Sequence, residues 1–462
     1  MRQLLYTVSL ITLLLPQTIK AQETGEPLKL SLEESINFAM KHQVKMKNAI
    51  LDQKSSLARN REVTGLALPN LKAKGGVNYA PLVAGFLVPN FTKFGIREYV
   101  DQPYWNQGAM SNTSDDYLNF ALQPKWTSTA TAELTQILFD PGVMVALQAR
   151  RALEHFAQLS VNLTEQELKA IITKTYYDVL IAEKRAELLD KNVERISELE
   201  RETREIYNVG LAEKIDVDRI TVTLNNLKTQ QTTVKQLLDV AYMSLKFQMG
   251  MDVDQEIALT DELDDNQLGA ELLTHPFDFE NRVEYQMLKT SDKLLSYDLK
   301  RYKLGGLPTL SAFGNYGYIL YNNTDLFAKG DKWQDQAMVG VQLSLPLFDG
   351  FQRRNKVKQA RYAYEKNKND MENLRNGLEI EKENARITLR ASISNLENQK
   401  QNIKLAEEVY DISKTKYKEG VGSSLEVMDA ETALKEAQTN YFNALYEANT
   451  ARISLLKALG EL

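Results

Sequence analysis

The sequence predicts a mainly α-helical fold with a smaller membrane β portion, arranged as two structural repeats. Three observations lead to this fold class. Long stretches almost lack proline and glycine, apolar residues recur along them at seven-residue spacing, and short segments between them alternate apolar and polar residues. The seven-residue spacing predicts coiled-coil helices. The alternation predicts strands with one apolar face.

Near its start the chain has a positively charged residue that is followed by a short apolar segment. Arg2 precedes the apolar run 4–15, and Ala21 follows at a suitable cleavage position. A run of about a dozen residues is too short to span a bilayer but suits the hydrophobic region of a signal peptide. We therefore expect residues 1–21 to be a signal peptide that sends the chain into the secretory route. A buried helix is the alternative, and Ile19 leaves the cleaved bond open.

The remainder of the sequence contains the same landmarks twice. They are a Leu-Pro pair (68–69 and 307–308), a Leu-Phe-Asp turn (138–140 and 347–349) and a Tyr-x-x-Gly tip (207–210 and 417–420). We expect a first repeat at 22–260 and a second at 261–462. The first repeat holds about 30 extra residues before its turn, by comparison of the landmark spacings, and they are expected to form a long loop.

Two segments, 143–206 and 351–417, are expected to be long helices. The first has no proline or glycine, so an unbroken helix would reach ~95 Å at 1.5 Å per residue. In the second, Gly377 is the one weak point. Each is expected to turn back as a helix hairpin, with tips near 207–216 and 417–429. Helices of this length are rare in globules and indicate an extended, self-paired architecture.

Four segments are expected to be strands, at 71–80, 126–139, 309–320 and 336–348. A tilted membrane strand needs about 9–11 residues, which these segments provide. Aromatic residues near the strand ends suit an interfacial girdle: Tyr79, Trp126, Tyr316, Tyr318 and Tyr321. The alternative is a sheet in a water-soluble sandwich.

The number of strands has a consequence for assembly. A sheet inside a bilayer must close, because an unpaired edge leaves backbone groups without hydrogen bonds. Four strands are too few, since the smallest membrane barrels have about eight. If these strands lie in a membrane, several chains must share one barrel, and such a tube conducts rather than catalyses.

Composition argues against several classes of function. Cysteine is absent, so the chain has no disulfide, thiolate metal site or acylated N-terminal cysteine, and its three histidines are far apart. We expect no metal and no cofactor. The net charge of −6 and the lack of a basic stripe give no reason to expect nucleic acid. No Gly-x-Ser-x-Gly, His-Glu-x-x-His or P-loop motif occurs, so an enzyme such as an extracytoplasmic hydrolase is not expected.

These landmarks together resemble the TolC family of outer-membrane efflux proteins. They are the signal peptide, the opening 30–36, the two Leu-Pro strand entries, the two Phe-Asp turns and the two tips, which continue as 215–217 and 425–430. The resemblance covers essentially the whole mature chain. It implies a homotrimer with a shared 12-stranded β-barrel in outer-membrane lipid and an α-helical barrel in the periplasm. It also implies two partners, a periplasmic adaptor protein and an inner-membrane pump of the RND or ABC type.

The resemblance also implies roles for tip residues. Glu426 and Asp429 would line a closed periplasmic aperture as an acidic ring; the alternative is solvated charge at a helix N-terminus, where carboxylates are favoured. Five further residues would form the tip latch and turns: Tyr207, Gly210, Asp216, Tyr417 and Gly420. Family members with the Asp–Tyr latch carry an arginine two residues after the tip glycine. Here that position is Gly422, so the ionic lock between subunits is in question.

Two other functions remain open at this level. A duct for type I secretion of proteins or peptides would have the same fold. A periplasmic coiled-coil scaffold without a channel would explain the heptads, but it would not explain amphipathic strands at equivalent points of two repeats.

Overall fold

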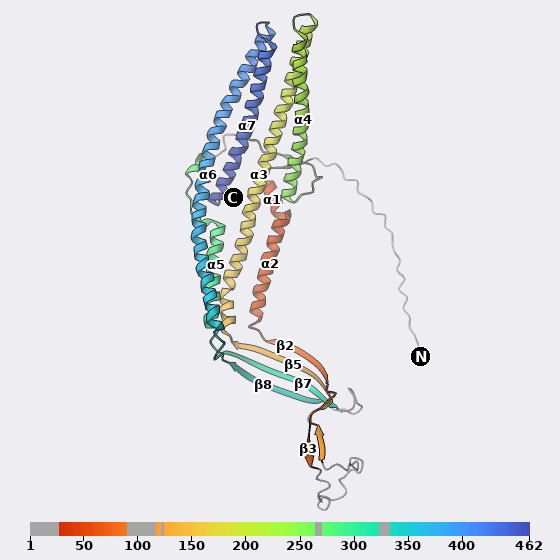
Figure 1. Ribbon diagram of the computed structural model, residues 1–462, viewed down its shortest axis with the longest axis vertical. Coiled ribbons are helices and arrows are strands. Elements are labelled where there is room, and N and C mark those ends of the chain that lie inside the picture. Colours follow the sequence, from red (N-terminus) through yellow and green to blue (C-terminus); the bar gives the residue numbers. More distant parts are fainter. Residues whose placement is uncertain (1–26, 90–116, 122–123, 264–269, 323–332) are drawn as a thin grey trace, which may run out of the picture. The chain divides into compact units, whose positions relative to one another are not determined.

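The computed structural model describes residues 27–89, 117–121, 124–263, 270–322 and 333–462 (Figure 1). The expected signal peptide lies outside these residues, as do parts of the segments that connect the two expected strands within each repeat. The fold is mainly helical. The chain divides into two compact units, and each unit draws on both halves of the sequence.

The first, which we call the sheet unit, comprises Leu51–Ser160 and Glu284–Arg375. Its elements include most of α2 (Val44–Gly65), all strands of the chain's described part except β1 (Leu28–Leu30) and β6 (Ile257–Leu259), nearly all of α5 (Val283–Leu304) and the first turns of α3 (Pro141–Asn208) and α6 (Gln352–Lys418). Four strands form one antiparallel sheet in the order β2-β5-β7-β8 (Figure 1): β2 (Asn70–Tyr79), β5 (Trp126–Phe139), β7 (Thr309–Asn322) and β8 (Gln334–Ser344).

Two details of the strands differ from the expectation. Strand β8 ends at Ser344, whereas the expected segment reached 348; Pro346 lies just beyond, and proline has no N–H to donate to a sheet ladder. In addition, β3 (Gly85–Pro89) and β4 (Tyr117–Ala121) pair as a separate two-stranded ladder. They lie in the insertion that was expected to be a loop.

The second, the helical unit, comprises residues up to Ile50, Val161–Val283 and Asn376–Leu462. It contains two helix hairpins, which Figure 1 shows as α3 with α4 (Lys214–Met249) and α6 with α7 (Ser424–Leu459). Helix α3 is 68 residues long and α6 is 67, and α6 passes through Gly377 without a break. None of the helices in the described ranges is apolar over enough length to cross a bilayer.

Glycines end the long helix of each hairpin. Gly210 and Gly420 have φ angles of 78° and 75°, the left-handed region that glycine adopts without strain. The next residue in each hairpin donates its N–H back to the long helix, from Leu211 to the carbonyl of Ile206 and from Val421 to that of Lys416, both at 3.0 Å. This is the hydrogen bond of a Schellman cap, which explains why each tip requires glycine.

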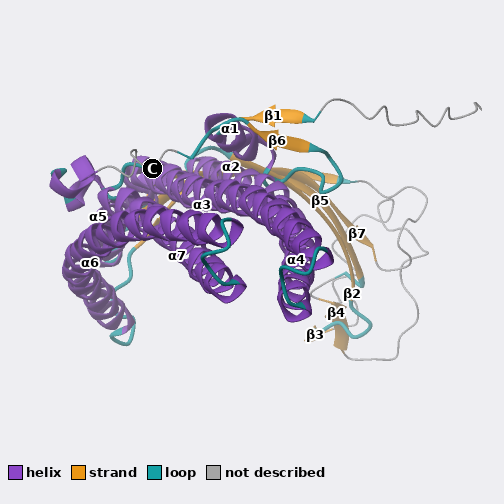
Figure 2. Cartoon of the chain, turned by 90° about the horizontal axis from the view of Figure 1, so that it is seen from above, coloured by secondary structure: helices purple, strands orange, loops and turns teal. Residues whose placement is uncertain are grey.

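The N-terminal part of the helical unit is held by a short parallel ladder. Strand β1 (Leu28–Leu30) pairs with β6 (Ile257–Leu259), and Figure 2 shows the pair next to α1 (Leu32–His42). The buried Tyr176 hydroxyl donates to the Leu30 carbonyl at 3.0 Å. Four separate clusters of buried apolar side chains follow the helices of this unit. Long paired helices form a series of small cores, because each helical turn contacts only the nearest turns of the helix beside it.

Candidate functional site

The acidic residues of the second tip lie in the first turns of α7. Ser423 caps this helix, and its side-chain oxygen accepts a hydrogen bond from the Glu426 N–H at 3.2 Å. Glu426 and Asp429 are exposed, whereas the neighbouring Val427 and Ala430 are buried in the core. Neither carboxylate has an ion-pair partner in the described part of the chain. Both are therefore available to a cation.

The first tip contacts the second through Asp216. One of its carboxylate oxygens accepts from the Glu213 N–H at 3.3 Å, and the other accepts a hydrogen bond from the Ser424 hydroxyl at the start of α7. The Tyr417 hydroxyl is buried and has no hydrogen-bond partner among the described residues. The structure thus pairs Asp216 with Ser424 and does not join it to Tyr417 by a hydrogen bond. Tyr207 is exposed at the first tip.

The backbone around Gly422 leaves little space for a side chain. Its N–H donates to the Lys416 carbonyl at 3.1 Å, and a Cβ placed on it would lie 3.0 Å from the Lys416 Cβ and 3.1 Å from the Tyr417 nitrogen. Such contacts are tighter than ordinary packing. Within the chain, an ion pair does join the two hairpins near this tip, because the Lys418 Nζ lies 2.7 Å from a carboxylate oxygen of Glu202 on α3.

A buried polar cluster joins the two hairpins below the tips. The Arg195 guanidinium on α3 contacts both carboxylate oxygens of Glu431 on α7, at 3.0 and 3.3 Å. It also lies over the Tyr410 ring of α6, 4.7 Å from the centroid. Farther along the same helices, the Asn192 amide donates to the Gln438 side-chain oxygen at 2.7 Å.

Burial sets the protonation chemistry of this cluster. Glu431 is only 2% exposed. Desolvation raises the pKa of its carboxyl above the ordinary value, and the attraction of Arg195 opposes this without reversing it. Burial likewise raises the pKa of Tyr410 to about 12.

The sequence analysis missed this cluster, although a signal was present. Val427, Glu431, Leu434, Gln438 and Tyr441 follow the four-three spacing of a coiled-coil seam. Two polar residues therefore occupy positions that normally point into the contact between helices, and buried polar side chains there require partners.

The sheet unit has two chemically different faces. Directly paired residues of neighbouring strands lie on the same face, so the register defines rows across all four strands. Two apolar rows are Leu71, Leu134, Gly314, Val339 and Ala73, Ala132, Tyr316, Ala337. The alternating polar rows are Lys72, Glu133, Asn315, Met338 and Lys74, Thr131, Gly317, Gln336. We call these the apolar face and the polar face.

Exposure and aromatic placement add to this pattern. On the apolar face, Leu71 is 72% exposed and Val339 85%. On the polar face, Lys74 and Glu133 form an ion pair between β2 and β5. At the end of the sheet far from the helices, the Tyr79 and Trp126 rings lie 4.4 Å apart. Amphipathic rings at the limit of an apolar band are typical of a membrane interface.

Known proteins are similar to this chain in sequence and in fold. Residues 305–461 match the family described as Outer membrane efflux protein. Outer membrane protein TolC of Vibrio cholerae is 24% identical over 343 residues, covering 72% of this chain and 77% of that protein. Outer membrane protein TolC of Escherichia coli K12 is 25% identical over 350 residues, covering 72% and 70%.

Solved structures match over a larger share of the chain. The outer membrane protein VceC of Vibrio cholerae covers 93% of this chain and 96% of its own, with a TM-score of 0.67 and 16% identity. The Campylobacter jejuni CmeC outer membrane channel covers 93% and 85%, with a TM-score of 0.68 and 15% identity. The chain therefore has the same fold as these solved outer-membrane proteins. Residues 305–461 of the chain thus match the outer membrane efflux protein family, and the resemblance to the TolC family is confirmed.

Proposed function

We propose that this protein is the outer-membrane channel of a tripartite efflux system, acting as a homotrimer that passively conducts solutes. The observation that carries the proposal is the open sheet with one apolar and one polar face. Such a sheet suits the wall of a shared barrel, with the apolar face toward lipid and the polar face toward water. The protein is not an enzyme in this proposal, in agreement with its channel relatives.

The two edges of the sheet that are unpaired in the described part of the chain support the proposed oligomer. In the described residues, β2 pairs only with β5, and β8 pairs only with β7. Both edges must find partners inside a bilayer, because no water satisfies their backbone groups there. Strand β8 of one copy would pair with β2 of the next. Membrane barrels need about eight strands or more, so closure requires at least two copies, and the family resemblance sets three, giving twelve strands.

The relatives support the location and the partners. They are named outer membrane proteins, and one is named a toluene efflux pump outer membrane protein. We therefore place the protein in the outer membrane, extending into the periplasm. Its helical hairpins would meet a periplasmic adaptor protein, and an inner-membrane pump of the RND or ABC type would supply the energy.

The tip residues support a gate in this tube. Three copies of Glu426 and Asp429 would place six exposed carboxylates around one axis, and acidic rings of this kind favour cations. The hydrogen bond between Asp216 and Ser424 and the ion pair between Lys418 and Glu202 would hold the two hairpins together in the closed state.

The test is the state and the conductance of the purified protein. We expect it in the outer-membrane fraction as a trimer that resists dissociation in detergent, with single-channel currents in a planar bilayer. A monomeric, water-soluble periplasmic protein that produces no current would reject the channel and favour a coiled-coil scaffold.

A further inference from the structure

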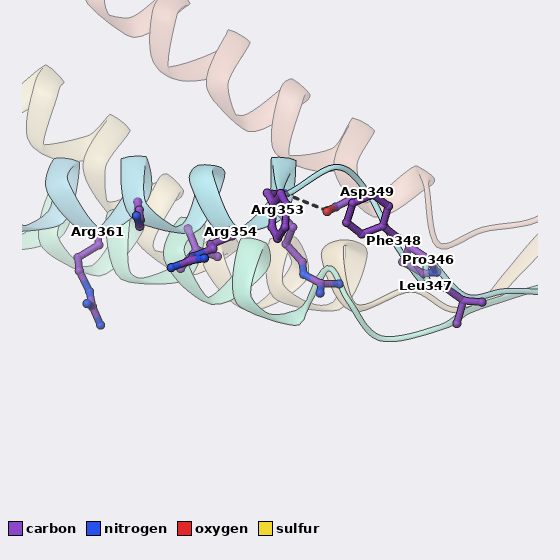
Figure 3. Close-up of a pocket in the computed structure, with 10 residues that line it drawn as sticks. Pro346, Leu347, Phe348, Asp349, Arg353, Arg354 and Arg361 are labelled. Atoms are coloured by element: carbon purple, nitrogen blue, oxygen red, sulfur yellow. Dashed lines mark hydrogen bonds between the residues drawn. The ribbon is translucent and has the colours of Figure 1, made fainter.

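The segment that connects β8 to α6 carries exposed apolar side chains. Leu347, Phe348 and Phe351 are 88%, 77% and 60% exposed. The Phe348 and Phe351 rings pack edge to face, with centroids 5.6 Å apart. Figure 3 shows Phe348 beside Asp349 in the turn, with the arginines of α6 following it. Large rings that contact each other but little else in the chain favour a partner outside it.

The backbone at this turn is strained. Phe351 has a φ of 63° and is the one non-glycine residue with positive φ among those described. A bulky residue rarely adopts this conformation. Strained backbone conformations of this kind cluster at functional sites, where the side chain binds a ligand or a partner. Here the strained residue carries an exposed aromatic ring, that of Phe351.

A basic stripe follows the aromatic pair. Between Asp349 and Glu365 the sequence has no acidic residue and five basic ones: Arg353, Arg354, Lys356, Lys358 and Arg361. Arg354, Lys358 and Arg361 are exposed and spaced four and three residues apart, so they share one face of α6. None of these three has an ion-pair partner among the described residues. With Phe348 they line an open hollow of about 400 Å³.

The turn itself does not require this charge. Asp349 accepts a hydrogen bond from the Arg353 N–H at 2.9 Å, and in the first repeat Asp140 accepts from the Gly142 N–H at 2.7 Å. In both turns, an aspartate side chain therefore accepts a hydrogen bond from a backbone N–H at the start of the helix. In the first repeat, however, residues 143–149 are uncharged. Cations are also disfavoured near a helix N-terminus unless an anion is present.

The basic stripe therefore requires an anion, and its position relative to the apolar face indicates which anion this is. Along β8, Val339, Val341 and Leu343 are exposed and alternate with polar-face residues, and the alternation continues to Leu347. The arginines begin where this apolar row ends. A sequence of apolar row, aromatic pair and basic stripe matches the order of hydrocarbon, interface and phosphate in a bilayer.

We propose that residues 347–361 form a binding surface for anionic phospholipid headgroups at the helix-side border of the membrane. Phe348 and Phe351 lie in the interface, and Arg354 and Lys358 bind the lipid phosphates. The Arg354 guanidinium provides paired donors for a phosphate, and the Lys358 ammonium provides a point charge. The inference rests on the proposed function, because it assumes that the sheet unit is inserted in the outer membrane.

The test uses the complete assembly purified in a mild detergent. Its melting temperature is followed through the helical circular-dichroism signal after addition of equal amounts of dioleoylphosphatidylglycerol or dioleoylphosphatidylcholine. We expect the anionic lipid to raise the melting temperature more than the zwitterionic lipid. In R354Q/K358Q at least half of this difference is lost. The control K366Q/K368Q removes the same amount of charge from exposed positions farther along α6. In this control we expect the anionic lipid still to raise the melting temperature more than the zwitterionic lipid, by the same amount as in the wild type.

A second variant separates lipid binding from folding. Phe351→Gly relieves the positive φ, so we expect a melting temperature in lipid-free detergent at least as high as that of the wild type, with a smaller gain from the anionic lipid. An equal lipid-specific gain in the wild type, R354Q/K358Q and Phe351→Gly would overturn the inference.

Conductance in phosphatidylcholine bilayers distinguishes the two proposals. If the wild type gives no channels, the proposed function fails. If it conducts but the variants keep the full lipid-specific gain, only the headgroup surface is rejected.

Discussion

The Arg195 guanidinium on α3 lies 3.0 Å from the Glu431 carboxylate on α7, in the interior of the helical unit. The two residues are 236 positions apart and belong to different repeats. Glu431 is buried, and Arg195 is partly buried, with 25% of its side chain exposed. This pair therefore links the two hairpins in a setting that solvent screens weakly.

Removing Arg195 should strongly destabilise the helical unit. In Arg195→Met, Glu431 stays buried without its cation, and breaking a buried pair costs about 3 kcal/mol or more in unfolding free energy. Chemical unfolding followed by circular dichroism measures this loss. The double variant R195M/E431L removes both charges and should recover most of it. If the single and double variants are equally unstable, loss of packing rather than the orphaned charge is responsible.

The raised pKa of Glu431 predicts a dependence of stability on pH. Because its folded-state pKa lies above the unfolded value, the folded chain binds the extra proton, and this contribution is complete below the unfolded pKa. It is lost as the pH rises through the folded pKa. Glu431→Gln should therefore gain stability relative to the wild type as the pH rises above about 4.3, the ordinary pKa of a glutamate. Parallel stability curves for the two proteins would contradict this.

The acidic tip residues should control ion preference. In Glu426→Ala and Asp429→Ala, single-channel recordings in asymmetric salt should show a weaker preference for cations and weaker block by multivalent cations, since part of the carboxylate ring is lost. Glu436 lies farther along the same helix, and Glu436→Ala provides the control. Unchanged selectivity in both tip variants would reject their place at the aperture.

Two glycines of α6 and its tip should respond oppositely to alanine. Gly420→Ala forces a Cβ into a φ of 75° and should cost about 1–2 kcal/mol of stability at the tip. Gly377→Ala lies inside α6 with no atom within 4 Å of the new methyl group, and should stabilise the helix by about 0.5–1 kcal/mol. Melting temperatures of the two variants measure the difference, and the same sign for both would refute the assignment of the cap.

Much of this fold is readable from local sequence, for identifiable reasons. The long helices follow from the absence of proline and glycine, and the tips follow from glycines placed where a left-handed residue is needed. The strands follow from period-two alternation. The β3–β4 ladder was missed because its segments lie in an insertion rich in turn-forming residues, where alternation over five residues carries little signal.

The polar contacts were much less predictable. The coiled-coil spacing predicts that Glu431 faces another helix. It does not predict which residue is its partner, because that residue is 236 positions away in the sequence. The family pattern pointed to Tyr417 as the partner of Asp216, whereas the structure places the Ser424 hydroxyl there. Side-chain partners depend on the register between two helix hairpins, and no local pattern in one helix specifies that register.

The two faces of the sheet give the sharpest test of the proposed barrel. Val341 and Gln342 are adjacent in β8 and exposed on opposite faces. In Val341→Arg the guanidinium would enter lipid, at a cost of about 2–4 kcal/mol near the bilayer midplane, whereas Gln342→Arg would point into the water-filled interior. We expect the first variant to assemble poorly in the outer membrane and the second to assemble normally with altered conductance. Immunoblots of trimer in outer-membrane fractions measure assembly. Equal assembly of the two variants would mean that the apolar face does not meet lipid, and the sheet would then belong to a water-soluble assembly.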